Sequence, residues 1–201
     1  MAEFSHYFTP PAADEHETRE FTLPYAGFEF AFKTDSGVFS RSKLDEGSRV
    51  LLDTLCDIDL AGSVLDLGCG WGAIGIILKK IYPNLTLTFA DINPRCVELT
   101  RENLRLNKQA AEAFVSDGAS SVDGAFDWIV LNPPIRAGKE KVREIIRGAA
   151  RKLAAEGKLA LVIRKKQGAE SMMRYLAEVF ASVERESRDK GYWVIVCGGR
   201  K

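Results

Sequence analysis

Two short motifs in this sequence combine a polar side chain with glycines, which leave the backbone accessible, or with prolines, which make it stiff. The first, VLDLGCGWG at residues 64–72, places Asp66 just before Gly68, Gly70 and Gly72. Glycines permit a tight turn and let a ligand approach the backbone closely, and amides at the start of a following helix favour acceptor-rich groups. A carboxylate beside such a turn would repel a diphosphate and attract a cation. This motif therefore favours a positively charged ligand.

The second motif, NPPI at residues 132–135, follows an apolar run that predicts a buried strand. Proline has no amide hydrogen and ends a strand ladder, so Pro133 and Pro134 make the peptide stiff at that point. The Asn132 side-chain oxygen and the Pro133 carbonyl would then be two fixed acceptors. Such a pair could accept hydrogen bonds from a ligand group at the end of this strand. The alternative is that the prolines only terminate a strand.

The glycines of the first motif leave a second ligand class open. Gly68, Gly70 and Ala73 fit the permissive G-x-G-x-x-A pattern of dinucleotide sites, and Asp91 follows at about the 20-residue spacing of an acid that binds ribose. Asp66 disfavours this alternative, because a carboxylate at the end of the first strand would face the diphosphate.

Strands and helices alternate along the chain from about residue 62, and this alternation decides where the motifs lie. Continuous apolar strands separated by helices predict an α/β fold: a Rossmann-like, seven-stranded, mostly parallel, doubly wound sheet whose last strand is antiparallel. Ligands of such sheets bind beyond the carboxyl ends of the strands, where the strand order reverses. We expect strands at 63–68, 85–91, 111–117, 126–132, 158–163, 182–189 and 192–198, and helices at 44–55, 71–82, 93–107, 141–157 and 171–180.

The N-terminal region precedes this alternation. Residues 1–19 are polar and predict an arm, and residues 20–201 predict one domain. Residues 20–33 alternate apolar and polar side chains around Ala26-Gly27, which predicts an N-terminal β-hairpin. Gly157 is expected to cap the helix at 141–157.

Composition narrows the class of protein. Hydrophobic residues make up 46% of the 201, enough for a substantial core. Lys+Arg and Asp+Glu both number 28, so any basic surface must be local. Four cysteines without a C-x-x-C pair and two histidines disfavour a metal site. No long apolar segment or signal peptide is present, which predicts a cytoplasmic protein with no membrane partner.

The first motif resembles that of the class I S-adenosylmethionine-dependent methyltransferases, whose cofactor carries an ammonium and a sulfonium. The resemblance implies that Asp66 contacts the methionyl amino end, that Asp91 pairs with the ribose hydroxyls and that Ile92 packs on the adenine. Asp117-Gly118 resembles the position at the adenine edge, and Asn93 caps the next helix. The implied cofactor site comprises Phe39, Asp66, Gly68, Cys69, Gly70, Gly72, Asp91, Ile92, Asn93, Asp117, Gly118 and Asn132.

NPPI resembles the N-P-P-[YF] motif of methyltransferases that act on planar amino groups of bases or of glutamine. The resemblance implies a catalytic set of Asn132, Pro133, Pro134 and Ile135. The fourth position is usually an aromatic that stacks on the target base, a contact worth about 1–3 kcal/mol. With Ile135 there, either another aromatic such as Phe39 or Phe8 substitutes, or stacking is weaker, or the substrate differs.

The segment DSGVFSRSKLDEGSRVLL at 35–52 resembles the one before the first motif in the "methyltransferase small" domain of bacterial small-subunit ribosomal RNA guanine-N2 methyltransferases. There GVFS and the following helix close over the cofactor, which implies that residues 20–43 are a hairpin extension and a cofactor-covering loop. The resemblance spans about residues 20–199 and implies ribosomal RNA or the small ribosomal subunit as partner. Well-known members carry a further degenerate methyltransferase domain before this one, so the exact RNA target stays open.

Basic residues follow two of the predicted strands and would rim the same site. They are Arg136 and Lys139, with Lys141 close by, after the fourth strand, and Arg164, Lys165 and Lys166 after the fifth. Phosphate contact is one interpretation and a solvated loop is the other. Two further functions stay open. One is a glutamine or small-molecule N-methyltransferase that uses the same two acceptors, Asn132 and Pro133, as a clamp on its substrate. The other is an RNA-binding assembly factor that holds the cofactor without turnover.

Overall fold

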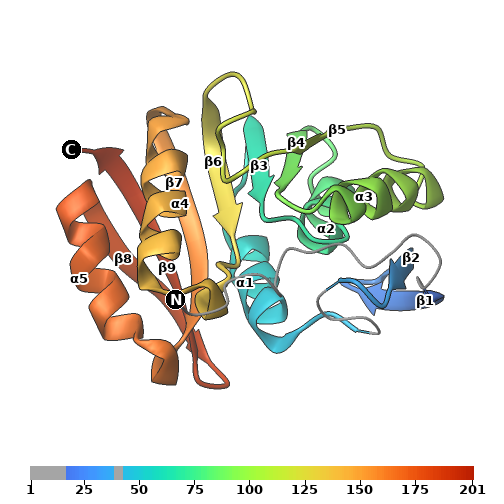
Figure 1. The fold of residues 1–201 in the computed structure, drawn as a ribbon, viewed down its shortest axis with the longest axis horizontal. Coiled ribbons are helices and arrows are strands. Elements are labelled where there is room, and N and C mark those ends of the chain that lie inside the picture. The colour runs from blue at the N-terminus through green and yellow to red at the C-terminus, as the bar shows by residue number, and fades with distance from the viewer. Residues whose placement is uncertain (1–16, 39–42) are drawn as a thin grey trace, which may run out of the picture.

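The computed structural model of the protein describes residues 17–38 and 43–201, and Figure 1 shows its fold. A seven-stranded sheet has the strand order β5-β4-β3-β6-β7-β9-β8. Its strands are β3 (Ser63–Leu67), β4 (Thr86–Asp91), β5 (Glu112–Val115), β6 (Phe126–Leu131), β7 (Leu153–Arg164), β8 (Phe180–Asp189) and β9 (Tyr192–Arg200). The pairs from β5 to β7 are parallel, and β9 runs antiparallel between β7 and β8. The predicted mostly parallel sheet is confirmed.

Helices cover both faces of the sheet, because alternate strand residues point to opposite sides. One buried cluster joins strand residues such as Val64 and Val162 to α1 (Glu46–Cys56), α2 (Ala73–Ile81) and α3 (Pro94–Leu106). The other joins residues such as Leu65 and Leu161 to α4 (Lys139–Arg151) and α5 (Ala169–Val179), which lie over one face in Figure 1. The sheet is therefore doubly wound, as predicted.

The strand order reverses between β3 and β6, which are neighbours although two strands separate them along the chain. Asp66 pairs with Phe89 of β4 on one side and with Val130 of β6 on the other. The carboxyl ends of β3, β4 and β6 therefore meet at one edge of the sheet. Both motifs lie at this edge, and β5 and β7 end there too.

The N-terminal hairpin lies apart from the sheet, beside α2 and α3 in Figure 1. Its strands are β1 (Thr18–Tyr25) and β2 (Phe28–Asp35), so β1 begins slightly before the boundary expected at residue 20. Ala26 and Gly27 form the turn with φ of 48° and 79°, the positive pair that a two-residue hairpin loop of type I′ requires. Phe32 packs edge-on against Trp71 of the first motif, with ring centroids 4.7 Å apart.

The predicted end of the fourth helix is wrong. The helix ends at Arg151 and β7 begins at Leu153, so Gly157 lies in a strand and caps no helix. Leu153 prolongs the helical apolar spacing of the sequence, which explains the error, but the structure pairs it with Phe126 of β6. A Cβ on Gly157 would lie 2.5 Å from the Phe126 carbonyl oxygen, so close strand packing is what requires glycine there.

Two short 3₁₀ turns follow strands at the edge of the sheet where the carboxyl ends meet. They are η1 (Ile135–Ala137) after β6 and η2 (Lys165–Gln167) after β7. Among the helices of residues 17–38 and 43–201, none has the length and apolar composition needed to cross a membrane.

Candidate functional site

Asp66 lies almost at the end of β3, and its side chain is only 2% exposed. Its Oδ2 accepts a hydrogen bond of 2.9 Å from the backbone amide of Gly75 in α2. Burial raises the pKa of this carboxyl to about 7, the Gly75 amide opposes that rise, and the nearby Asp91 adds to it. The site thus holds a buried carboxylate close to a second one, an arrangement that a cation would stabilise.

The glycine loop after β3 is tied to the end of β4. The Gly68 and Cys69 amides donate to the Ala90 carbonyl at 2.7 and 3.1 Å, and the Gly70 amide donates to Asp91 Oδ2 at 2.9 Å. Gly68 and Gly70 have φ of 70° and 58°, and a Cβ on either would meet no heavy atom within 4 Å. The loop therefore presents bare backbone to open space at the sheet edge.

Asp91 holds the next strand end in place. Its Oδ1 accepts from the Asn93 amide at 2.9 Å, and Asn93 Oδ1 in turn accepts from the Arg95 amide, which caps α3. Burial raises the Asp91 pKa, and its backbone hydrogen bonds oppose the rise. The Ile92 amide adds a third backbone hydrogen bond to this carboxylate, and Ile92 itself is half-buried.

Other predicted cofactor residues have different surroundings. Cys69 is buried with Sγ 3.5 Å from Thr100 Oγ1, and burial raises the pKa of its thiol. It therefore contributes backbone to the loop rather than a reactive thiol.

Asp117 follows β5, is exposed and pairs with Lys141 at 2.9 Å. This pair ties down Lys141, one of the cations grouped with the site from the sequence. A Cβ on Gly118 would meet no heavy atom within 4 Å. Phe39 lies outside the described residues, so its predicted role stays a prediction.

The peptide of the second motif is held in a fixed turn. Pro134 has φ of −74° and ψ of 77°, and the Ile135 amide donates to the Pro133 carbonyl at 2.8 Å, which together form an inverse γ-turn. One lone pair of that carbonyl is thus used and the other stays available. Pro133 is buried, whereas Asn132 and Ile135 are half-buried. The stiffness expected from the two prolines is present.

The predicted cationic side chains lie at, or a few residues after, the ends of two neighbouring parallel strands. Arg136 and Lys139 come after β6, and Arg164, Lys165 and Lys166 come at the end of β7; all five are exposed. The Arg164 guanidinium lies over the Tyr192 ring, 5.8 Å from its centroid. Because β6 and β7 end at the same sheet edge as Asn132, both groups border the site.

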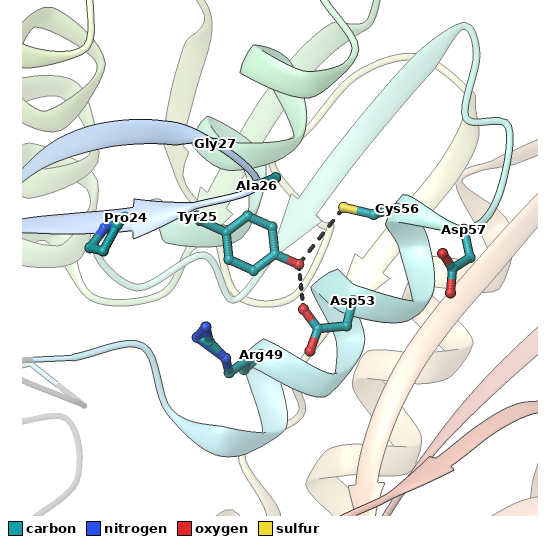
Figure 2. Close-up of a pocket in the computed structure, with 8 residues that line it drawn as sticks. All are labelled: Pro24, Tyr25, Ala26, Gly27, Arg49, Asp53, Cys56 and Asp57. Atoms are coloured by element: carbon teal, nitrogen blue, oxygen red, sulfur yellow. Dashed lines mark hydrogen bonds between the residues drawn. The ribbon is translucent and has the colours of Figure 1, made fainter.

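A cavity of about 540 Å³ lies elsewhere, between the hairpin turn and α1. Figure 2 shows Tyr25 pointing from the hairpin to Asp53 and Cys56 on α1, and the Tyr25 hydroxyl donates to Asp53 Oδ1 at 2.6 Å. Burial raises the pKa of both the Tyr25 hydroxyl and the Cys56 thiol, so neither is an activated nucleophile. This contact docks the hairpin on the helix.

Three residues at the site were not predicted from the sequence. Gly75 supplies the amide that holds Asp66, and a Cβ there would lie 2.3 Å from Phe89. Asp45 and Ser48, at the start of α1, accept hydrogen bonds from the Asn132 side chain. A glycine inside a helical pattern signals close packing, and an aspartate before an apolar helix signals a cap, but neither pattern names the partner.

Within residues 17–38 and 43–201, no group of three or more His, Cys, Asp or Glu side chains is placed to bind a metal ion.

Comparison with known proteins gives the family. The family model of the methyltransferase small domain matches residues 29–196. The uncharacterized protein YbxB of Bacillus subtilis is 39% identical over 193 residues, which cover 94% of this chain and 96% of YbxB. Ribosomal RNA small subunit methyltransferase C of Serratia proteamaculans is 40% identical over 142 residues, 69% of this chain and 41% of that protein.

A solved structure agrees with these relatives. The T. thermophilus 16S rRNA N2 guanine methyltransferase RsmC, in complex with AdoMet and guanosine, matches with a TM-score of 0.83 and 26% identity. The match covers 94% of this chain and 52% of that one, so the chain spans about half the length of this relative and less of the Serratia enzyme. The family model and the relatives together confirm the resemblance seen in the sequence: the chain belongs to the methyltransferase small domain family of S-adenosylmethionine-dependent methyltransferases.

Proposed function

We propose that this protein transfers a methyl group from S-adenosylmethionine to the exocyclic N2 amine of a guanine in ribosomal RNA. The observation that carries the proposal is the meeting of two features at one sheet edge: a buried carboxylate beside an open glycine loop, and a stiff Asn-Pro-Pro turn on the adjacent strand. The Thermus relative with the same domain binds AdoMet and guanosine, which supports both ligands.

The residues at the edge fit this cofactor. The sulfonium and ammonium are cationic, and Asp66 and Asp91 are two carboxylates whose pKa values are raised by burial. Gly68 and Gly70 leave room for a ligand against the backbone. Asp66 would hold the amino end, and Asp91 would accept hydrogen bonds from the ribose. A dinucleotide diphosphate would meet the Asp66 carboxylate and be repelled.

The turn after β6 would hold the acceptor amine. Asn132 Oδ1 and the free lone pair of the Pro133 carbonyl would each accept one amine hydrogen, which orients the nitrogen lone pair towards the methyl group. When bound, the cofactor would supply an electrophilic methyl, and the amine nitrogen held by Asn132 and Pro133 would form the new C–N bond as the C–S bond breaks, with S-adenosylhomocysteine as the leaving group. The methylated nitrogen then gives its extra proton to water, so no strong protein base is required.

A ribosomal substrate is supported by the cationic rim. Arg136, Lys139 and the run Arg164-Lys165-Lys166 are exposed around the edge that holds Asn132, although the net charge of the chain is zero. Local positive charge at the mouth of a site is what phosphate contact needs. Ribosomal RNA as substrate also favours a cytoplasmic location.

The test is a methylation assay on small ribosomal subunits from cells that lack the gene. We expect N2-methylguanosine to appear on incubation with the protein and S-adenosylmethionine, as read by mass spectrometry of nucleosides. Asn132→Ala should lower the single-turnover rate about 100-fold, the size of effect seen when one preorganised hydrogen-bonding group is removed, with cofactor affinity nearly unchanged. Asn84→Ala, an exposed asparagine before β4, is the matched control.

Two outcomes would contradict the proposal. Methylation of glutamine or of a small molecule, with none of ribosomal RNA, would replace the substrate class and keep the clamp. Binding of the cofactor to subunit-bound protein with no methyl transfer to any substrate would make the protein an assembly factor.

A further inference from the structure

The side-chain amide of Asn132 is held from outside its own strand. Its Nδ2 donates to Ser48 Oγ at 3.0 Å and to Asp45 Oδ1 at 3.3 Å. Both partners lie at the start of α1, more than 80 residues earlier in the chain, and Ser48 is only 6% exposed. A proposed clamp residue thus depends on a helix that follows the segment expected to cover the cofactor.

The chemistry of these partners decides which way the amide faces. A carboxylate can only accept hydrogen bonds, so the NH₂ group of Asn132 must be the one that faces Asp45. The Asn132 oxygen then points the opposite way and is left for another donor. If the amide turned over, two oxygens would oppose each other at the carboxylate, and NH₂ would face the acceptor amine.

Asp45 is itself fixed in place. It is the N-cap of α1, and the same Oδ1 accepts from the Ser48 backbone amide at 3.1 Å. Such a cap satisfies an otherwise unpaired amide of the first helical turn. The carboxylate position is therefore set by the helix, and the hydroxyl of Ser48 lies one turn along on the same side.

We propose that Asp45 and Ser48 are positioning residues that lock the Asn132 amide with its oxygen towards the acceptor amine. This inference rests on the proposed role of Asn132 as an acceptor in N-methylation. Neither residue touches the reacting atoms; both act through Asn132. They make the clamp selective for a group that carries two hydrogens, because only the oxygen of the amide is presented.

Three substitutions at position 45 separate the cap from the hold on Asn132. Asp45→Ser keeps a good N-cap, but its shorter side chain cannot reach Asn132. Asp45→Asn keeps an oxygen that can serve both purposes. Asp45→Ala loses both. We expect Asp45→Ser and Ser48→Ala each to lower single-turnover methyl transfer about tenfold at unchanged cofactor affinity and melting temperature. Asp45→Asn should recover most of the rate lost in Asp45→Ser.

A double-mutant cycle shows whether the effect passes through Asn132. In the Asn132→Ala background, Asp45→Ser should cause no further loss, because there is no amide left to orient. A merely structural role would lower the rate by the same factor in both backgrounds, and that result would overturn the proposal.

A spectroscopic readout needs no substrate. The side-chain ¹⁵N resonances of Asn132, assigned by their absence in Asn132→Ala, should show slow hydrogen exchange in the wild type and in Asp45→Asn. Exchange should become fast in Asp45→Ser and Ser48→Ala, and unchanged exchange in both would overturn the inference. Full activity of Asn132→Ala would instead defeat the proposed clamp, so the two failures are distinguishable.

Discussion

At the residue scale, Asp66 meets opposing requirements. Its burial raises its pKa to about 7 from an ordinary value of 3.8, so an ionised Asp66 is unfavourable in the folded protein without a ligand. A cationic ligand beside it would favour the ionised form. The site therefore has an electrostatic penalty that its proposed cofactor would remove.

The affinity for S-adenosylmethionine should consequently depend on pH. Binding a cation next to Asp66 favours ionisation, so binding releases a proton and weakens as the pH falls below the Asp66 pKa. From a pKa of about 7, we expect affinity to drop about fivefold from about pH 7 to about pH 6. Titration calorimetry in two buffers of different ionisation enthalpy measures both the affinity and the number of protons released. Equal affinity at the two pH values, with no proton release, would contradict this role of Asp66.

Asp66→Asn should stabilise the fold and lose the cofactor. Asparagine can still accept from the Gly75 amide but never ionises. Because the Asp66 pKa is raised, wild-type stability is greatest when the carboxyl is protonated and declines as the pH rises towards about 7. The advantage of the variant in the free energy of unfolding should thus grow by about 2–3 kcal/mol between about pH 5 and about pH 7. Urea unfolding at both pH values is the measurement; an advantage that does not change with pH would refute the explanation.

The sequence was enough to place Asp66, Asp91 and Asn132 together, because the carboxyl ends of parallel strands meet at one edge. It was not enough to find Gly75 or Asp45, since their contacts join segments far apart in the chain. Spacing along the sequence reports which strand or helix a residue occupies; it does not report the partner across a helix–sheet contact.

At the element scale, α1 joins two parts of the molecule. Its first turn holds Asn132, and farther along Asp53 receives the Tyr25 hydroxyl of the hairpin. The helix was expected at 44–55 and lies at Glu46–Cys56, so its existence was predictable from apolar spacing. The end of α4 was not, because Leu153 fits the helical pattern and a strand equally well.

The boundary between α4 and β7 can be tested with two glycines. Gly157→Ala should destabilise the fold by about 1–3 kcal/mol, because its Cβ would overlap backbone atoms of Phe126 and Ala154. Gly148→Ala lies inside α4, where the nearest atom to a Cβ is 3.9 Å away, and should stabilise by about 0.5–1 kcal/mol through helix propensity. Thermal unfolding of both variants gives the comparison; if Gly157→Ala behaves like Gly148→Ala, position 157 is not closely packed.

At the scale of the whole molecule, two asparagines attach the hairpin to α3: Asn103 in the last turn of the helix and Asn107 at its C-cap. Asn103 accepts from the Lys33 amide at 2.7 Å and donates to the Lys33 carbonyl at 3.0 Å. Asn107 does the same with Ala31, at 3.2 and 2.7 Å. Asn103 also donates to the Trp71 carbonyl at 2.8 Å, which links the hairpin to the glycine loop. The sequence pattern did not predict these contacts between the hairpin and the two asparagines.

Asn103→Ala should loosen this attachment. The side chain is fully buried, and its loss would remove its hydrogen bonds to the Lys33 amide and carbonyl and to the Trp71 carbonyl. We expect a loss of about 2–3 kcal/mol in the free energy of unfolding, together with faster hydrogen exchange in β2. Hydrogen exchange followed by mass spectrometry is the measurement, with Asn84→Ala as control. Protection of β2 equal to that of the control would show that the remaining contacts, such as those of Asn107 with Ala31 and of Tyr25 with Asp53, hold the hairpin without Asn103.

The two asparagines have a consequence for association between molecules. A lone hairpin has a bare outer strand, and unpaired amides and carbonyls in such a row readily recruit strands of other chains. In β2 the outward-facing backbone groups of Ala31 and Lys33 are already paired with the side-chain amides of Asn107 and Asn103. The two side chains thus make the hydrogen bonds that a neighbouring strand would make in a larger sheet. This stretch of β2 therefore has no unpaired backbone groups with which a strand of another molecule could pair.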